Sequence, residues 1–180
     1  MAQRAIQDYL SSGEVTEIII DGSRVITESD LAYCSYGNLT PEMQLTNAFT
    51  KIVNVTPFIT PSQVSLTSGT FTVTNEELEI WRFSFERIYR NEDTSPTTPV
   101  KIYIQMKQNG VVVFSRDAVI GAATAADEPS ILAFSTNRII PVNNGDQFEF
   151  EVKAAETTSN NTPADTYLTN FEVTAHKIGY

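Results

Sequence analysis

Alternating apolar and polar side chains predict β-strands along most of the chain after about residue 43. The pattern is strongest in residues 78–90, where four aromatic side chains fall two or four positions apart: Trp81, Phe83, Phe85 and Tyr89. Successive side chains of a strand point to opposite faces, so this spacing places all four on one face and polar residues on the other. The segment is therefore predicted to be a strand that buries an aromatic stripe.

Five further segments carry the same period of two and are predicted to be strands: residues 69–73, 100–107, 111–116, 147–153 and 166–178. Asn109-Gly110 favours a tight hairpin between the second and the third, because both residues tolerate the positive φ of a type I′ turn. In the last segment the pattern places Tyr167, Phe171 and Val173 on one face. No helical period is sustained in this region, so the predicted fold class is all-β, in the form of a β-sandwich.

The first 42 residues differ from the rest and are predicted to form an N-terminal arm. They contain one firm hairpin signal, Asp21-Gly22 between the β-prone residues 15–20 and 23–27. The aliphatic side chains of this hairpin need burial against a partner, and they are the predicted attachment residues: Ile18, Ile19, Ile20, Val25 and Ile26. A flexible leader is the alternative interpretation of this segment.

The charge of the chain bears on its partners. Acidic residues outnumber basic ones by 22 to 12, which gives a formal net charge of −10. Residues 1–50 hold seven acidic and two basic residues, so the arm is the more densely acidic part. Binding to a phosphate backbone relies on clustered Lys and Arg, so the composition argues against nucleic acid as a partner.

Candidate catalytic groups are few, because the chain has a single cysteine, Cys34, and a single histidine, His176. Cys34 has no adjacent Lys, Arg or His to activate it and is expected to be a small buried hydrophobe. No nucleophile motif accompanies His176. The chain is therefore predicted not to be an enzyme and to use no cofactor.

Paired carboxylates occur at Glu76-Glu77, at Asp127-Glu128 and at Glu149 with Glu151. A glycosidase would need two such groups in a cleft, and the sequence gives no sign of one, so these residues are expected to be solvated. Glu92-Asp93 and Asp127-Glu128 could supply oxygen ligands to calcium, but neither matches a known calcium loop, so no metal site is predicted.

Targeting signals are not evident. Residues 1–10 lack the apolar run of a secretory signal, and the longest apolar runs, Ile18–Ile20 and Val111–Phe114, are too short to cross a bilayer. The sequence therefore predicts synthesis in a cytoplasm and no membrane partner.

Six stretches follow one another in an order that resembles a known superfamily: Gln44–Ile52, Gly69–Val73, Trp81–Phe85, Val100–Arg116, Val142–Phe148 and Leu168–Phe171. The order is similar to that of the tumour necrosis factor and complement globular-head superfamily of trimeric jelly rolls. Two family features differ, since Asn75-Glu76-Glu77 replaces a Gly turn and Thr169-Asn170 replaces the closing Ser-Gly. The resemblance implies a jelly-roll domain over residues 43–180, after the arm of residues 1–42.

The resemblance also implies a homotrimer, with Tyr167, Phe171 and Val173 expected at its interface. A jelly roll with a short acidic arm resembles virion proteins of bacteriophages, in which such an arm attaches to the particle. The resulting hypothesis is a capsid decoration (cement) protein, made in the host cytoplasm and bound as a homotrimer to the major capsid protein or another virion protein. The alternative is the receptor- or carbohydrate-binding tip of a phage fibre or spike, binding through loops 91–99 and 154–165.

Overall fold

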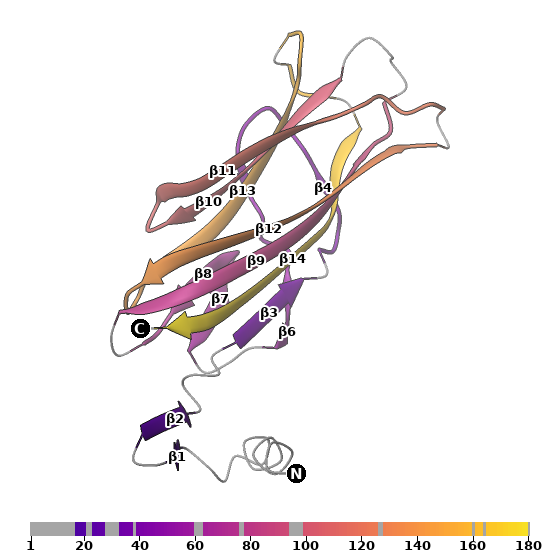
Figure 1. Ribbon diagram of the computed structural model, residues 1–180. Helices are drawn as coiled ribbons and strands as arrows, with labels where there is room; N and C mark the ends of the chain where they lie inside the picture. The colour runs from indigo at the N-terminus through magenta and orange to yellow at the C-terminus, as the bar shows by residue number, and fades with distance from the viewer. Residues whose placement is uncertain are drawn as a thin grey trace, which may run out of the picture.

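Two antiparallel β-sheets pack face to face as a sandwich (Figure 1), which confirms the all-β, jelly-roll prediction. The computed structural model describes residues 17–20, 23–27, 33–37, 39–59, 63–75, 78–93, 99–125, 128–159, 161–163 and 165–179. Within these ranges the chain consists of strands, turns and loops. None of this described backbone forms a helix of the length and apolarity that a bilayer crossing requires.

The first sheet contains the predicted hairpin of residues 100–116. Its hydrogen-bonded order is β11–β10–β13–β8–β7, and β5 pairs with β13 beside this path. The strands are β5 (Thr50–Lys51), β7 (Val64–Thr67), β8 (Thr70–Val73), β10 (Val100–Gln108), β11 (Val111–Ile120) and β13 (Gln147–Glu156).

The second sheet contains the strand with the aromatic stripe. Its order is β12–β9–β14–β3–β6, and β4 pairs with β14 beside this path. The strands are β3 (Tyr33–Gly37), β4 (Met43–Gln44), β6 (Thr56–Ile59), β9 (Glu79–Asn91), β12 (Ser130–Val142) and β14 (Thr166–Gly179).

The aromatic stripe of β9 lies between the two sheets, as predicted. All four of its rings are at most 2% exposed. Phe83 packs against Phe148 of β13, with ring centroids 4.7 Å apart, and Phe85 packs against Phe150 at 5.1 Å. Each such buried ring stabilises the fold by about 2–3 kcal/mol. The stripe therefore holds the two sheets together.

Two tight turns meet at one end of the sandwich. Asn109 and Gly110 have φ of 52° and 79°, the conformation expected of a type I′ turn. The second turn lies at Asn144-Gly145, directly before Asp146. The Asp146 carboxylate accepts hydrogen bonds from Asn109 Nδ2 (2.6 Å), Gln108 Nε2 (2.7 Å) and the backbone N–H of Asn143 (2.8 Å). Burial alone would raise the pKa of Asp146, but these hydrogen bonds outweigh it, and the pKa lies below its ordinary value.

An ion pair is buried near one end of β9. The Lys177 ammonium lies 3.0 Å from Glu79 Oε1, and the two side chains are 3% and 4% exposed. Glu79 Oε2 also accepts a hydrogen bond from Trp81 Nε1 at 2.8 Å. This pair links β9 to β14 inside the sandwich.

The last strand, β14, departs from the predicted alternation. Its pairing with β9 shifts by one residue between Leu168 and Asn170, which is the signature of a β-bulge. The shift turns Leu168, rather than Tyr167, to the interior beside Phe171 and Val173. The prediction that Tyr167 shares a face with those two residues is therefore wrong.

The N-terminal segment divides into two parts. The predicted hairpin is present, because β1 (Glu17–Ile20) pairs with β2 (Ser23–Thr27) in a two-stranded sheet of its own. β3 pairs with β14 and β6, and it contributes Cys34 and Tyr36 to the core. The sandwich thus includes residues from 33 onward, ten positions before the boundary that the sequence suggested.

Candidate functional site

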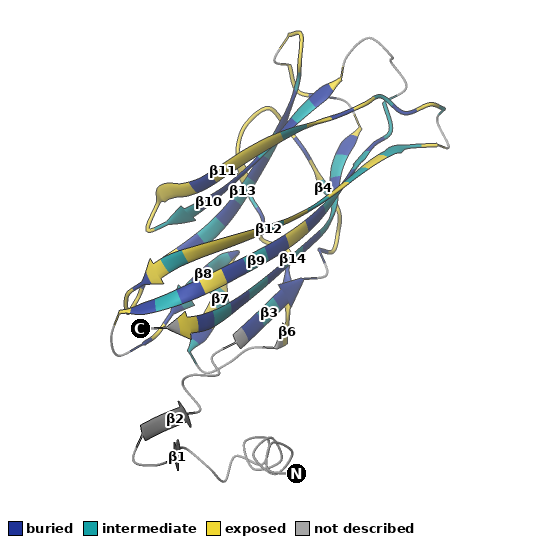
Figure 2. Cartoon of the chain, viewed as in Figure 1, coloured by how far each residue is buried: buried dark blue, intermediate teal, exposed yellow. Residues whose placement is uncertain are grey.

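β11 and β12, each at one edge of its sheet, carry many exposed residues (Figure 2). Pro141 lies in β12, and an edge position suits proline because it has no N–H to give to a further strand. Large aliphatic side chains that are 37–67% exposed lie along both strands, and together they are called the edge patch: Val111, Val112, Val113, Val119, Ile131 and Ile139. Arg116, Asp117 and Arg138 also lie on these strands, and charges of this kind blunt an edge. Exposed aliphatic side chains in such numbers are nevertheless typical of surfaces that bind another chain.

A cleft of about 350 Å³ opens between these two edge strands. β9 and β11 supply its cationic side chains, Arg87 and Arg116, and β12 supplies Phe134 and Thr136. Asp117 also lines it, but the Asp117 carboxylate lies 2.8 Å from the Lys101 ammonium. We call Arg87, Arg116, Phe134 and Thr136 the arginine cleft.

Arg87 is the buried member of the arginine cleft. It occupies an inward position of β9 and is only 4% exposed. Its guanidinium lies between the rings of Phe85 (5.4 Å to the centroid) and Phe134 (5.2 Å), and Nη1 donates to Thr136 Oγ1 at 3.0 Å. Among the described residues Nε has no acceptor, and no carboxylate pairs with the guanidinium. The cation–π contacts stabilise this charge but do not neutralise it.

Two further arginines lie beside Arg87 at the edge strands. Arg116 pairs in register with Ile104, whose side chain is buried between the sheets, so Arg116 also faces inward. Arg138 of β12 stacks on Phe114, with Cζ 4.6 Å from the ring centroid. Neither Arg116 nor Arg138 forms an ion pair with a carboxylate in the described part of the chain.

The electrostatics of the arginine cleft favour an anion. Burial, the largest cause, lowers the pKa of Arg87 from its ordinary value; the nearby Arg116 lowers it further, and the phenol of Tyr89 opposes the change. A buried cation without a counter-ion costs folding free energy, and a second cation beside it adds to the cost. A carboxylate or another anion in the cleft would remove both costs.

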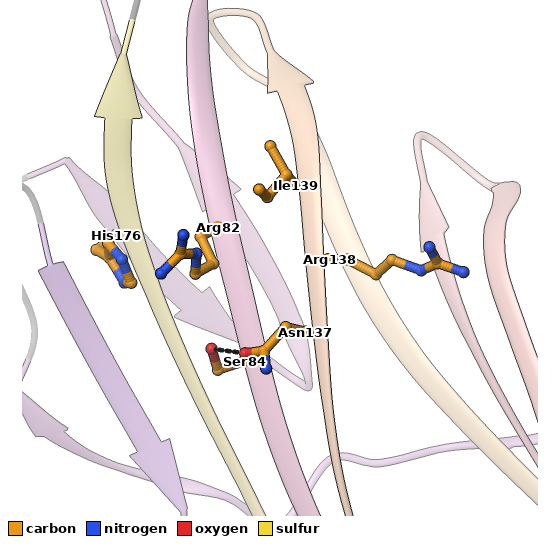
Figure 3. A pocket seen from close by; sticks show the side chains of 6 residues that line it. All are labelled: Arg82, Ser84, Asn137, Arg138, Ile139 and His176. Atoms are coloured by element: carbon orange, nitrogen blue, oxygen red, sulfur yellow. Dashed lines mark hydrogen bonds between the residues drawn. The ribbon is translucent and has the colours of Figure 1, made fainter.

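A second hollow, of about 570 Å³, lies on the outer face of the β12–β9–β14 sheet (Figure 3). Arg82 and His176 lie side by side on neighbouring strands, and the hydroxyl of Ser84 hydrogen-bonds the side chain of Asn137. Arg138 points away from them, toward the β10–β11 hairpin. Burial and then the charge of Arg82 lower the pKa of His176, so this histidine favours its neutral form.

The predicted attachment residues lie in the β1–β2 hairpin, where Ile18 pairs with Ile26 along the backbone. The side chains of Ile18, Ile19, Ile20, Val25 and Ile26 lie outside the described residues, so their role stays a prediction. Loops 91–99 and 154–165 are described only in part, because residues 94–98, 160 and 164 lie outside the description.

Two of the predicted trimer residues are buried within one protomer. Phe171 and Val173 are 1% and 2% exposed, and Phe171 packs against Phe150 with centroids 5.2 Å apart. Side chains covered by their own chain offer little surface to a neighbour, and the role of Tyr167, Phe171 and Val173 at a trimer interface stays a prediction. Tyr167 is half-buried, with the Arg90 guanidinium 5.3 Å from its ring centroid.

Cys34 is a buried core residue, as predicted. It is 2% exposed, and burial raises the pKa of its thiol to about 12, so the thiolate is not formed at neutral pH. Its burial fits the predicted role of a small buried hydrophobe.

The predicted solvated carboxylates of β13 instead form ion pairs on the outer face of their sheet. Glu149 lies 2.9 Å from the Lys51 ammonium, and Glu151 lies 2.7 Å from that of Lys107. The hydrogen bond from Lys51 is the main cause that lowers the pKa of Glu149. Glu76, Glu77 and Asp127 lie outside the described residues. Nowhere in the described ranges do three or more potential metal ligands gather.

Sequence reasoning missed the arginine cleft, although one signal was present. Arg87 stands two residues after Phe85 and two before Tyr89, so the alternation of β9 places it inward with the aromatics. A charged residue in a buried register indicates either a partner or a site. Arg116 and Arg138 could not be assigned to the same cleft, because the facing of β11 and β12 across the sandwich is not visible in the sequence.

No family model matches the chain, and no curated protein matches it. Among solved structures, the PRD1 vertex protein P5 is similar over 84% of this chain and 99% of that chain, with 9% sequence identity and a TM-score of 0.46.

Proposed function

We propose that this chain is a structural virion protein: a capsid decoration (cement) protein that attaches as a homotrimer to a bacteriophage capsid and stabilises it. The β-sandwich would face outward, and the N-terminal hairpin would contact the major capsid protein or another virion protein. The sequence resemblance to trimeric jelly rolls of the tumour necrosis factor type is one support for this proposal.

The observation that carries the proposal is the edge patch. Exposed aliphatic side chains on two strands that each have one free edge would favour aggregation of a monomer, because such edges pair with other chains. Burial of this surface against identical neighbours around a closed axis removes the hazard and leaves no free apolar edge. A structural, self-associating protein therefore fits the surface better than a monomeric enzyme does.

The β1–β2 hairpin supports the attachment step. It forms a separate two-stranded sheet, and isolated hairpins of this size are at best marginally stable in water. Its sequence is rich in isoleucine and valine. Docking of these side chains on a capsid surface would supply the apolar burial that the hairpin needs.

The proposal is tested by adding purified protein to capsids of the encoding phage that lack it. We expect saturable binding in a fixed ratio to the capsid subunits, and capsids that resist heat better after binding. Charged substitutions in the hairpin, Ile19→Asp with Ile26→Asp, should abolish binding while the sandwich still unfolds cooperatively.

A matched control is Val53→Asp, an exposed aliphatic position of the sandwich outside the hairpin and the edge patch. This variant should bind as the unmodified protein does. Protein that ignores capsids but coats host cells would instead support the fibre- or spike-tip function and overturn the decoration role.

A further inference from the structure

The arginine cleft holds positive charge that the described chain leaves unbalanced. Arg87 is buried and Arg116 is exposed beside it, and neither pairs with a carboxylate among the described residues. Acidic residues outnumber basic ones by 22 to 12, so such a gathering of unpaired arginines is unexpected in this chain. The buried guanidinium is aimed into an open cleft, and the described part of the protomer supplies no anion to it.

A second surface of the same chain has the opposite imbalance. Glu86 of β9 and Glu172 of β14 are direct cross-strand partners on the outer face of their sheet. Like charges in this position destabilise a sheet. The flanking positions are uncharged, since Ser135 pairs with Glu86 on one side, and Gly37 and Phe58 lie beside Glu172 on the other. No described cation forms an ion pair with either carboxylate. We call Glu86 and Glu172 the carboxylate pair.

The two charged surfaces cannot neutralise each other within one protomer. The carboxylate pair lies on the outer face of the β12–β9–β14 sheet, whereas the guanidinium of Arg87 points from β9 to the inside of the sandwich. Two different surfaces that complement each other produce a head-to-tail contact between copies, and such contacts form a ring where the rotation from one copy to the next closes. In such a ring, both charged surfaces of every copy are paired with a neighbour.

We propose that the arginine cleft of each protomer binds the carboxylate pair of the next copy of this chain. The inference rests on the homotrimer of the proposed function and says which surfaces form its interface. Apolar surface accompanies both charged groups: the edge patch lies on the two strands that border the cleft, and Phe58, 57% exposed, lies beside Glu172.

The experiment measures the molar mass of the full-length protein in solution, without capsids, by light scattering during size-exclusion chromatography. The unmodified protein should have three times the chain mass of 20.0 kDa. Arg116→Glu and Glu86→Arg change exposed residues and should each weaken association at least ~30-fold, because each places like charges in contact. The double variant exchanges the two charges and should recover the trimer.

Matched controls reverse charges elsewhere on the surface: Lys153→Glu and Glu128→Arg should remain trimeric. Circular dichroism shows whether each variant is folded; where a reversal unfolds the chain, the neutral variants Arg116→Gln and Glu86→Gln replace it and should weaken the trimer to a smaller degree.

A trimer that persists in both single variants, or a double variant that stays dissociated, overturns the inference and leaves the proposed function standing. A monomeric unmodified protein overturns the inference together with the homotrimer. Capsid attachment is measured separately, so its failure is distinguishable from either result.

Discussion

At the scale of single residues, Lys177 and Glu79 show how dependent a buried charge is on its partner. Lys177→Met would leave the Glu79 carboxylate buried with only Trp81 Nε1 as a hydrogen-bond donor. We expect the free energy of unfolding to fall by about 3–5 kcal/mol, measured by urea denaturation. The double variant Lys177→Met with Glu79→Gln removes both charges and should lose less. A double variant that loses as much as the single one would contradict this account.

Asp146 gives a pH-dependent expectation. Its folded pKa lies below the ordinary value of 3.8, so its stabilisation is complete above that value and is lost as the pH falls through the folded pKa. Asp146→Asn should cost about 1–3 kcal/mol at pH 7, because the amide cannot accept all the hydrogen bonds of the carboxylate. The difference between the two proteins should shrink below pH 4. Denaturation curves at pH 7 and pH 3 measure it, and a constant difference would argue against an ionised Asp146.

Removal of the Arg87 charge, in contrast to the two substitutions above, is not expected to lower the free energy of unfolding, since no described carboxylate pairs with this buried guanidinium. Arg87→Met keeps an apolar side chain between Phe85 and Phe134 and removes the charge. In the dissociated Glu86→Arg background we expect the free energy of unfolding to stay unchanged or to rise by about 1–2 kcal/mol. In the otherwise unmodified chain the same substitution should weaken the trimer. Strong destabilisation in the dissociated background would assign Arg87 a purely structural role.

At the scale of elements, the sequence predicted strands well where alternation is regular. β9 and the β10–β11 hairpin follow their apolar period and turn residues closely. In β14 the sequence predicts the wrong faces for Tyr167 and Leu168, which precede the bulge, because a bulge reverses the face of every residue on one side of it. Phe171 and Val173, beyond the bulge, share one buried face as the alternation predicts. The sequence places β3 in the arm because the strand is short. Its partner β14 is far away along the chain, and its other partner β6 has only a weak strand pattern.

The placement of β3 predicts where the arm can be cut. Removal of residues 1–30 leaves β3 intact and should preserve cooperative unfolding with a midpoint near that of the full chain. Removal of residues 1–42 also deletes Cys34 and Tyr36, whose side chains are 2% and 0% exposed, and should lower the midpoint sharply or prevent folding. Thermal unfolding followed by circular dichroism compares the two. Equal stability of both truncated chains would mean that β3 does not contribute to the folded core.

At the scale of the whole molecule, the proposed interface combines charged and apolar contacts, and salt separates the two. Screening acts on the ion pairs between the arginine cleft and the carboxylate pair, and it spares the edge patch. We therefore expect the trimer dissociation constant to rise about tenfold between 50 mM and 500 mM NaCl, measured by light scattering at several protein concentrations. The charge-exchanged double variant should show the same dependence. A trimer indifferent to salt in this range would leave the apolar contacts as its whole basis.

The assembly state stays a prediction, and its interface residues are the hardest part of the molecule to predict from the sequence. Tyr167, Phe171 and Val173 were chosen from the apolar pattern of one strand, and two of them serve the protomer's own core. Residues of a core and residues of an interface are both apolar, so the sequence pattern does not distinguish them. Only the sandwich geometry separates them, because it shows which apolar and charged side chains remain uncovered.

The two tight turns beside Asp146 also govern how the protein ages. Both are Asn-Gly dipeptides, Asn109-Gly110 and Asn144-Gly145, and Gly after Asn leaves the backbone open to succinimide formation and deamidation. Asn109 Nδ2 lies 2.6 Å from Asp146 Oδ1. Conversion of this amide to a carboxylate would place two negative charges at that distance, where they repel. Slow chemistry at this end would therefore loosen the β10–β11 hairpin before it affects the core of the sandwich.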